Sequence, residues 1–252
     1  VLGAVEEQIG NLRSALSEHP RHADWDYRLG VLLRHAGRLP EAIDAFRRVL
    51  RGSATTPEHE EIVTLTQIAL GRLYYETDRL DQAVEAYQRV PRTSSQFDVA
   101  LYEIAWVYIR QGDSTQAERA LEVLSVAAPE SRFIPDGKIL RGNLLLRNGR
   151  FEDANTVFRE VAQQFGPVRR ELDAMITSHD DPRAYFRDLV RNNMENFDAN
   201  AFLPPLATRW ARTEGDMDRA LTVLSDLGAC RTLVRETGEL IERLNAVLGS
   251  PH

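Results

Sequence analysis

The histidines and the paired carboxylates are the side chains best suited to metal binding or acid–base catalysis. His19 and His22 lie three positions apart, but Pro20 between them breaks the helical spacing that would align two imidazoles, which favours a solvated turn. His59 is followed by Glu60 but lacks the second histidine of a zinc-protease helix. The histidine spacing therefore predicts no metal site.

Nucleophile and phosphate-binding motifs are also missing from the sequence. The single cysteine, Cys230, excludes an internal disulfide framework, and its amphipathic surroundings predict a small core residue. Glu152 and Asp153 are adjacent, so on a helix they diverge by about 100° and do not converge as catalytic carboxylates would. There is no glycine-rich phosphate loop and no G-x-S-x-G motif. We therefore predict that the chain is not an enzyme and needs no cofactor.

Charge and hydropathy restrict the classes of partner. The 252 residues carry 31 basic and 38 acidic side chains, a net charge of −7, which excludes a generally basic surface and predicts no nucleic-acid partner. No apolar run approaches the roughly 18–20 residues that span a bilayer, so no membrane span is predicted. The chain begins with Val1, and we expect that a signal peptide or longer N-terminal part has been removed. The location, periplasmic or cell-envelope versus cytoplasmic, stays open.

The elements that position these side chains follow helical spacing, and four segments repeat. Each segment has a small residue in a first helix, then a turn residue, then a second helix with a large apolar residue. The small residues are Gly30, Gly71, Ala105 and Gly142, which lie 41, 34 and 37 residues apart. The turn residues are Gly37, Asp78, Gly112 and Gly149, and the large apolar residues are Phe46, Tyr87, Leu121 and Phe158.

A helix–turn–helix unit with a period near 34 residues resembles the tetratricopeptide repeat. The second unit matches that pattern best, at Leu70, Gly71, Tyr74, Ala83 and Tyr87. The leading aromatic residue of the pattern is absent from all four units. The resemblance covers about residues 23–167. It implies an all-α fold, a right-handed α-solenoid of helix-turn-helix repeats with a C-terminal helical cap. The degenerate fourth unit is most similar to repeat proteins of bacterial cell envelopes.

Three parts of the chain are predicted. Residues 1–22 hold an N-terminal helix over 4–18, either half of a preceding repeat or a cap. Residues 23–167 hold the four repeats, with a lengthened helix from Pro57 to Thr77 that Thr56 caps. Residues 168–252 hold C-terminal helices over 168–178, 182–194 and 229–248. They also hold a degenerate fifth repeat, marked by Gly215, Met217, Ala220 and Leu224, whose first helix would start near Pro204 and Pro205. The last helix is either a cap or a helix that binds a partner or a second copy of the chain.

Close packing explains why glycine is kept inside the first helices at a cost of about 1 kcal/mol against alanine. We expect each small residue to lie opposite the alanine of its own second helix, for example Gly71 opposite Ala83. We also expect the turn residues, Asp78 among them, to adopt the left-handed conformation that ends a helix.

The resemblance further implies that the first helices line a concave face that carries the ligand contacts. Projecting the register onto that face yields aromatic side chains, one arginine from each repeat and one asparagine. The candidate partner-binding residues are Tyr27, Arg34, Arg72, Tyr75, Tyr102, Trp106, Arg110, Asn143 and Arg147. The same projection adds Ile68, Ile109, Ile139 and Leu146. Aromatic residues and arginine dominate interface hot spots.

These features predict a non-catalytic protein–protein interaction scaffold. An acidic peptide or partner segment would bind the Arg and aromatic groove within a multiprotein complex, because arginine pairs with carboxylates in a bidentate way. Two alternatives stay open: a helical accessory or regulatory domain of a larger enzyme or sensor, and a glycan-binding envelope protein in which Trp106 stacks on sugars.

The register makes a prediction about stability. Ala83→Leu should lower the free energy of unfolding by about 1–3 kcal/mol, because a larger side chain overpacks the contact between the two helices of the second repeat. A thermal melt with an unchanged midpoint would contradict the register.

Overall fold

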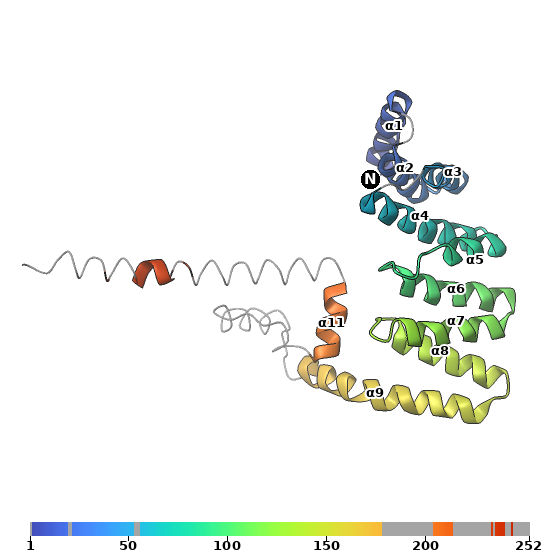
Figure 1. Cartoon of the computed structure of the whole chain (residues 1–252), viewed down its shortest axis with the longest axis vertical. Helices are drawn as coiled ribbons and strands as arrows, with labels where there is room; N and C mark the ends of the chain where they lie inside the picture. The colour runs from blue at the N-terminus through green and yellow to red at the C-terminus, as the bar shows by residue number, and fades with distance from the viewer. Residues whose placement is uncertain are drawn as a thin grey trace, which may run out of the picture. The chain divides into compact units, whose positions relative to one another are not determined.

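The computed structural model describes residues 2–19, 22–52, 56–177 and 204–213, together with residues 233, 235–239 and 243. The described segments contain helices and no strand, so the predicted all-α class is confirmed. Figure 1 labels α1 (Leu2–Glu18), α2 (Ala23–His35), α3 (Leu39–Val49), α4 (Pro57–Glu76), α5 (Leu80–Gln88), α6 (Phe97–Gln111), α7 (Ser114–Ala127), α8 (Ile134–Arg147), α9 (Phe151–Thr177) and α11 (Pro205–Thr213). The chain forms two compact units, Val1–Phe158 and Arg159–His252.

Several expectations for the C-terminal part fall outside the described residues. These are the helix over 182–194, the four markers of the fifth repeat and Cys230. Most of the predicted final helix also lies outside them, although residues 233, 235–239 and 243 are helical. The division of the chain at residues 22 and 167 stays a prediction.

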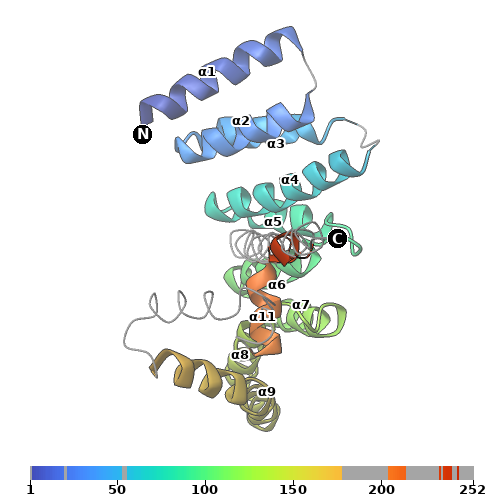
Figure 2. The ribbon, with the colours of Figure 1, turned by 90° about the vertical axis from the view of Figure 1, so that its left-hand side faces the viewer.

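The first unit is a stack of helical hairpins. Within each repeat the two helices pack together, α2 with α3, α4 with α5 and α6 with α7, and each second helix packs on the next first helix. The first helices also approach one another, α2 with α4 and α4 with α6. Figure 2 shows this order from α1 to α8. The first helices therefore share one side of the stack, which we call the inner face.

The turns inside the repeats confirm the predicted left-handed residues. Gly37, Gly112 and Gly149 have φ angles of 74°, 81° and 74°, and Asp78 has 61°. The next amide then turns back to the first helix, as where Arg38 N–H donates to the Leu33 carbonyl over 2.8 Å. This bond satisfies a carbonyl that the end of the helix would leave without a partner. Asp78 accepts the conformation because a short polar side chain tolerates it better than most.

The packing of the glycines differs from the expectation. An added Cβ at Gly30 would lie 2.6 Å from the ring of Phe46, and the corresponding distances are 2.5 Å for both Gly71 with Tyr87 and Gly142 with Phe158. The nearest contact of each glycine is therefore the aromatic ring of the second helix, not the alanine. Each ring packs closely against its own first helix, because only glycine leaves room for it there.

The third repeat adjusts both members of this contact. At the same register positions it has Ala105 and Leu121, which are 0% and 1% exposed. The first-helix residue is larger by one methyl group, and the second-helix residue is smaller than an aromatic ring. Total volume at the contact is thus roughly conserved, which close-packed interiors require.

Hydrogen bonds repeat between neighbouring hairpins. Arg47 Nε donates to the hydroxyl of Tyr74 over 3.0 Å, and at the same register position one repeat later Gln88 Nε2 contacts the hydroxyl of Tyr108 over 3.1 Å. Thr56 caps α4 as predicted, because its hydroxyl accepts from the amide of His59 over 3.2 Å. The lengthened helix, Pro57–Glu76, is confirmed.

The N-terminal helix is attached to the first repeat by apolar contact and by ion pairs. Ile9 of α1 is 1% exposed, and α1 packs on α2. Arg13 of α1 donates to Glu41 of α3, and Arg38 pairs with both Glu41 and Glu6 of α1. Hydrogen bonds from Arg38 and Arg13 lower the pKa of Glu41 to about 2.

In the second unit the helix expected to begin after Pro167 has no separate start. α9 continues through Pro167 to Thr177 as one helix. Proline inside a helix removes one amide donor and clashes with the carbonyl four residues earlier, and a helix that continues through it is usually kinked. Here the ring of Phe165 lies 5.9 Å from that of Trp210 in α11. α11 begins at Pro205, a position where proline is favoured.

The ring-on-glycine contact can be tested by a mutant cycle. Gly30→Ala should destabilise the chain by about 1–3 kcal/mol through overpacking, despite the better helix propensity of alanine. Adding Phe46→Leu reproduces the Ala105 and Leu121 combination of the third repeat. The double mutant should therefore lose at least about 1 kcal/mol less than the two single losses combined, measured by urea unfolding. Strict additivity would contradict this assignment.

The ion pairs of α1 predict a dependence of stability on pH. Because the pKa of Glu41 lies below its ordinary value of 4.5, its stabilisation is present above that pH and is lost as the pH falls toward about 2. Glu41→Gln should therefore flatten the fall in urea midpoint between those pH values. Glu7→Gln, an exposed change on α1, is the control and should leave the slope of the parent chain. Equal slopes for both variants would refute the role of Glu41.

Candidate protein-binding surface

His19 and His22 both contact the ring of Trp25. His22 stacks on Trp25 with ring centroids 4.1 Å apart, and His19 meets the same ring edge-on at 6.0 Å. Within the described ranges, no three His, Cys, Asp or Glu side chains gather where they could hold a metal ion. The described helices also include none that is long and apolar enough to cross a membrane.

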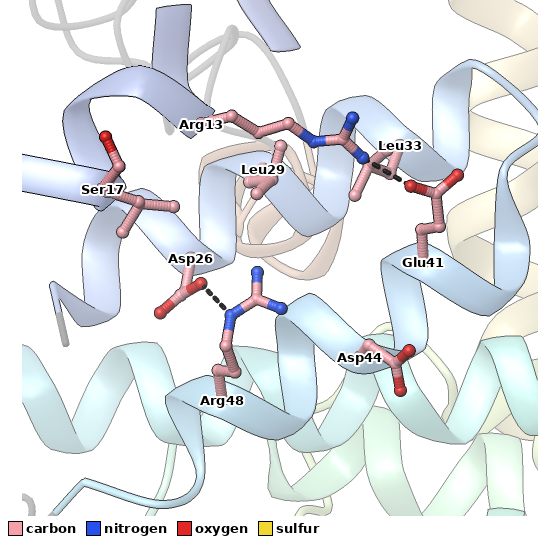
Figure 3. Close-up of a pocket in the computed structure, with 9 residues that line it drawn as sticks. Arg13, Ser17, Asp26, Leu29, Leu33, Glu41, Asp44 and Arg48 are labelled. Carbon is pink, nitrogen blue, oxygen red and sulfur yellow. Dashed lines mark hydrogen bonds and ion pairs between the residues drawn. The ribbon is translucent and has the colours of Figure 1, made fainter. Parts of the chain in front are cut away.

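A pocket of about 430 Å³ lies between α1, α2 and α3 (Figure 3). Its floor includes Leu29 and Leu33, and charged side chains stand around it. Arg48 Nε lies 2.7 Å from Oδ1 of Asp26, a residue only 3% exposed, and Arg13 pairs with Glu41 across the pocket from them. A carboxylate with so little access to water needs such a partner.

The chemistry of this pocket is structural. Its two arginines and two of its three carboxylates are paired, and the low pKa of Glu41 keeps that carboxylate ionised, which suits neither a general acid nor a base near neutral pH. A pocket of about 190 Å³ occupies the same place one repeat later, between α3, α4 and α5. There Tyr74 replaces Leu33 and fills part of the space. The larger pocket is therefore a consequence of the repeat and of a smaller side chain.

On the inner face, Arg72 of α4 is held by the chain itself. Its Nη2 and Nε lie 2.5 and 2.9 Å from the two carboxylate oxygens of Glu103 in α6. The hydroxyl of Tyr87 in α5 donates to the same carboxylate over 2.9 Å, and burial with the nearby negative charge raises the pKa of Tyr87. This network joins three helices. It also neutralises the arginine that was expected to meet an acidic partner.

Arg110 of α6 is also held by contacts within the chain, and one of its partners is Tyr75 of α4. The guanidinium carbon of Arg110 lies 4.8 Å from the centroid of the Tyr75 ring, and Nη1 donates to the Tyr75 carbonyl over 3.0 Å. Arg110 also pairs with Asp78 at 3.0 Å. Tyr27 is half-buried against Phe46 at 5.7 Å, and burial raises its pKa. The aromatic side chains of α2 and α4 are thus largely engaged within the chain.

The α6 and α8 part of the inner face is more open. Tyr102 stacks on Phe133, which precedes α8, with centroids 4.8 Å apart, and meets Trp106 edge-on at 6.4 Å. Trp106 is 40% exposed.

Three polar side chains projected onto the inner face are exposed and make no ion pair or side-chain hydrogen bond with a described residue: Arg34, Asn143 and Arg147. These three polar side chains have free donors to offer a ligand.

Glu103 is the inner-face residue that the sequence argument missed. It follows Tyr102 directly on α6, the first helix that comes after the α4 helix of Arg72. A carboxylate at that place was the signal for a partner of Arg72. Ile68, which the projection placed on the inner face, is only 3% exposed. Its helix lies between α2 and α6, both of which approach it.

Comparison with known proteins identifies the repeat. Tetratricopeptide repeat models match residues 21–90 and 99–131. No curated protein matches the sequence. The solved structures that resemble the chain include "Crystal structure of MamA". It is 18% identical with a TM-score of 0.56, and the alignment covers 67% of this chain and 92% of that one.

Two further solved structures resemble the chain in fold. One is a tetratricopeptide repeat protein from Parabacteroides merdae, 17% identical with a TM-score of 0.51, aligned over 90% of this chain and 93% of that one. The other is a Podosopora anserina putative kinesin light chain with nearly identical TPR-like repeats, 18% identical with a TM-score of 0.51 over 67% and 90%. At these identities the likeness shows the fold alone.

Tetratricopeptide repeat proteins generally mediate protein–protein interactions, and the fold is typically a non-catalytic interaction module. The repeated hairpins, the left-handed turn residues and the two matching models agree with one another. Residues 21–90 and 99–131 of the chain are therefore tetratricopeptide repeats.

Proposed function

We propose that the first unit is a non-catalytic scaffold whose inner face binds an acidic segment of a partner protein within a multiprotein complex. The observation that carries the proposal is the pair of exposed arginines, Arg34 and Arg147, which have no partner in the described chain. Every other arginine projected onto this face is already neutralised, Arg72 by Glu103 and Arg110 by Asp78. The two free guanidinium groups are the ones available to a partner's carboxylates.

The paired arginines have a different role. Reversing the charge of Arg72 would leave Glu103, whose side chain is 22% exposed, beside a second carboxylate. Such a variant would lose binding through damage to the network of α4, α5 and α6, whatever the partner contacts. The test must therefore use arginines whose removal breaks no pair in the described chain.

The experiment is affinity purification of the intact protein followed by mass spectrometry. Partners recovered by the parent chain should be lost with Arg34→Glu plus Arg147→Glu. When the affinity for a recovered partner is measured, it should fall at least about tenfold, because each charged hydrogen bond contributes about 1.5–3 kcal/mol.

Arg119→Glu plus Arg159→Glu is the matched control. Both residues are exposed on second helices, make no ion pair with a described residue, and produce the same change in net charge. The control should recover the same partners as the parent chain. Equal recovery by both double variants would refute the proposed inner-face site.

A further inference from the structure

We propose that the partner segment is an amphipathic helix that places large apolar side chains on α6 and α8 and carboxylates beside Arg147. This inference rests on the proposed function and specifies its ligand. The α6–α8 patch consists of Tyr102, Trp106, Ile109, Ile139 and Leu146.

The α6–α8 patch is apolar and accessible. Trp106, Ile139 and Leu146 are 40%, 42% and 41% exposed, and Tyr102 and Ile109 are half-buried beside them in the register. Single exposed apolar residues are ordinary, but a group on the same side of two successive first helices marks an interaction site. Each of these side chains lies at a position that the register assigns to the inner face.

The patch is held in place before any ligand arrives. Tyr102 stacks on Phe133 with an interplanar angle of 18°, and Ser131 Oγ donates to Asp98 Oδ2 over 2.6 Å. Both contacts join the first half of α6 to the segment just before α8. A surface fixed in this way loses little conformational entropy on binding, which favours affinity.

The α2–α4 part of the inner face does not offer a similar surface. Ile68 is buried, the ring of Tyr75 is covered by Arg110, and Arg72 is bonded to Glu103. A ligand meets few exposed apolar atoms there. Apolar contact is therefore concentrated on the α6–α8 patch.

The charge around the α6–α8 patch indicates which kind of segment binds there. Around the α6–α8 patch Arg147 is an inner-face cation without a partner in the described chain, whereas Arg110 pairs with Asp78 and Glu103 is occupied by Arg72 and Tyr87. Asn143, exposed on α8, adds an uncharged donor. A segment with acidic flanks complements this edge. An apolar patch spread over two successive first helices complements the apolar face of a helical ligand, which contacts it at i, i+3, i+4 and i+7.

The probes are three synthetic peptides of about 18 residues, a length that forms several helical turns. The first has leucine at i, i+3, i+4 and i+7 with glutamate on the flanks. The second replaces leucine with serine, and the third replaces glutamate with lysine. Fluorescence anisotropy with the full chain should show at least about tenfold tighter binding of the first peptide than of either other.

Variants then locate the site. Ile139→Ser plus Leu146→Ser should weaken the first peptide at least about tenfold, and because both residues are exposed the thermal midpoint should change little. Val123→Ser plus Val126→Ser is the matched control, since these residues of α7 are 41% and 79% exposed. The control should bind the peptide like the parent chain.

Three results would overturn the inference: equal binding of all three peptides, no effect of the Ile139 and Leu146 changes, or a dimer of the full chain that those changes dissociate. The last result would make a second copy the occupant. If a captured partner is lost with the Arg34 and Arg147 variant but not with the Ile139 and Leu146 variant, the scaffold proposal survives and this inference fails. If neither variant affects the partner, both fail.

Discussion

The contact between a small residue of each first helix and the side chain sixteen positions later is the constraint on which the structure depends. A ring carbon of Phe46, Tyr87 or Phe158 lies within 2.6 Å of the place where a Cβ would stand, so the two helices of these repeats keep a close arrangement that a larger residue would not permit. That arrangement sets where the next hairpin packs. Once the hairpins are in register, the inner face and its side chains follow.

Several charged side chains of this protein bond to neighbouring helices and are therefore not available to bind a partner. Asp26 is buried with Arg48, and Glu103 accepts from both Arg72 and Tyr87. These pairs tie helices of the same or neighbouring repeats together, and breaking one would leave a poorly solvated charge. Only the charged side chains that the stack leaves without a partner are available for recognition, which restricts the proposed site to a few positions.

Much of the fold could be predicted from sequence because its signals are local. The left-handed turns are indicated by Gly37, Gly112 and Gly149. The start of α4 is indicated by Thr56 followed by Pro57. Such signals depend on the conformational preferences of one or two residues. The helix boundary predicted at Pro167 was wrong because it used only the local preference of proline to end a helix. In the structure α9 continues through this residue.

Spacing along the sequence was enough to predict the repeat, its period and the helix boundaries near the turns. All of these depend on spacing along one chain segment. Tertiary structure alone decided which inner-face arginines are free. Arg72 and Glu103 are 31 residues apart in sequence, so no local pattern reveals that they meet. It also decided that each glycine faces a ring and that Ile68 is buried while Ile139 is exposed, because both depend on which neighbouring helix approaches each position.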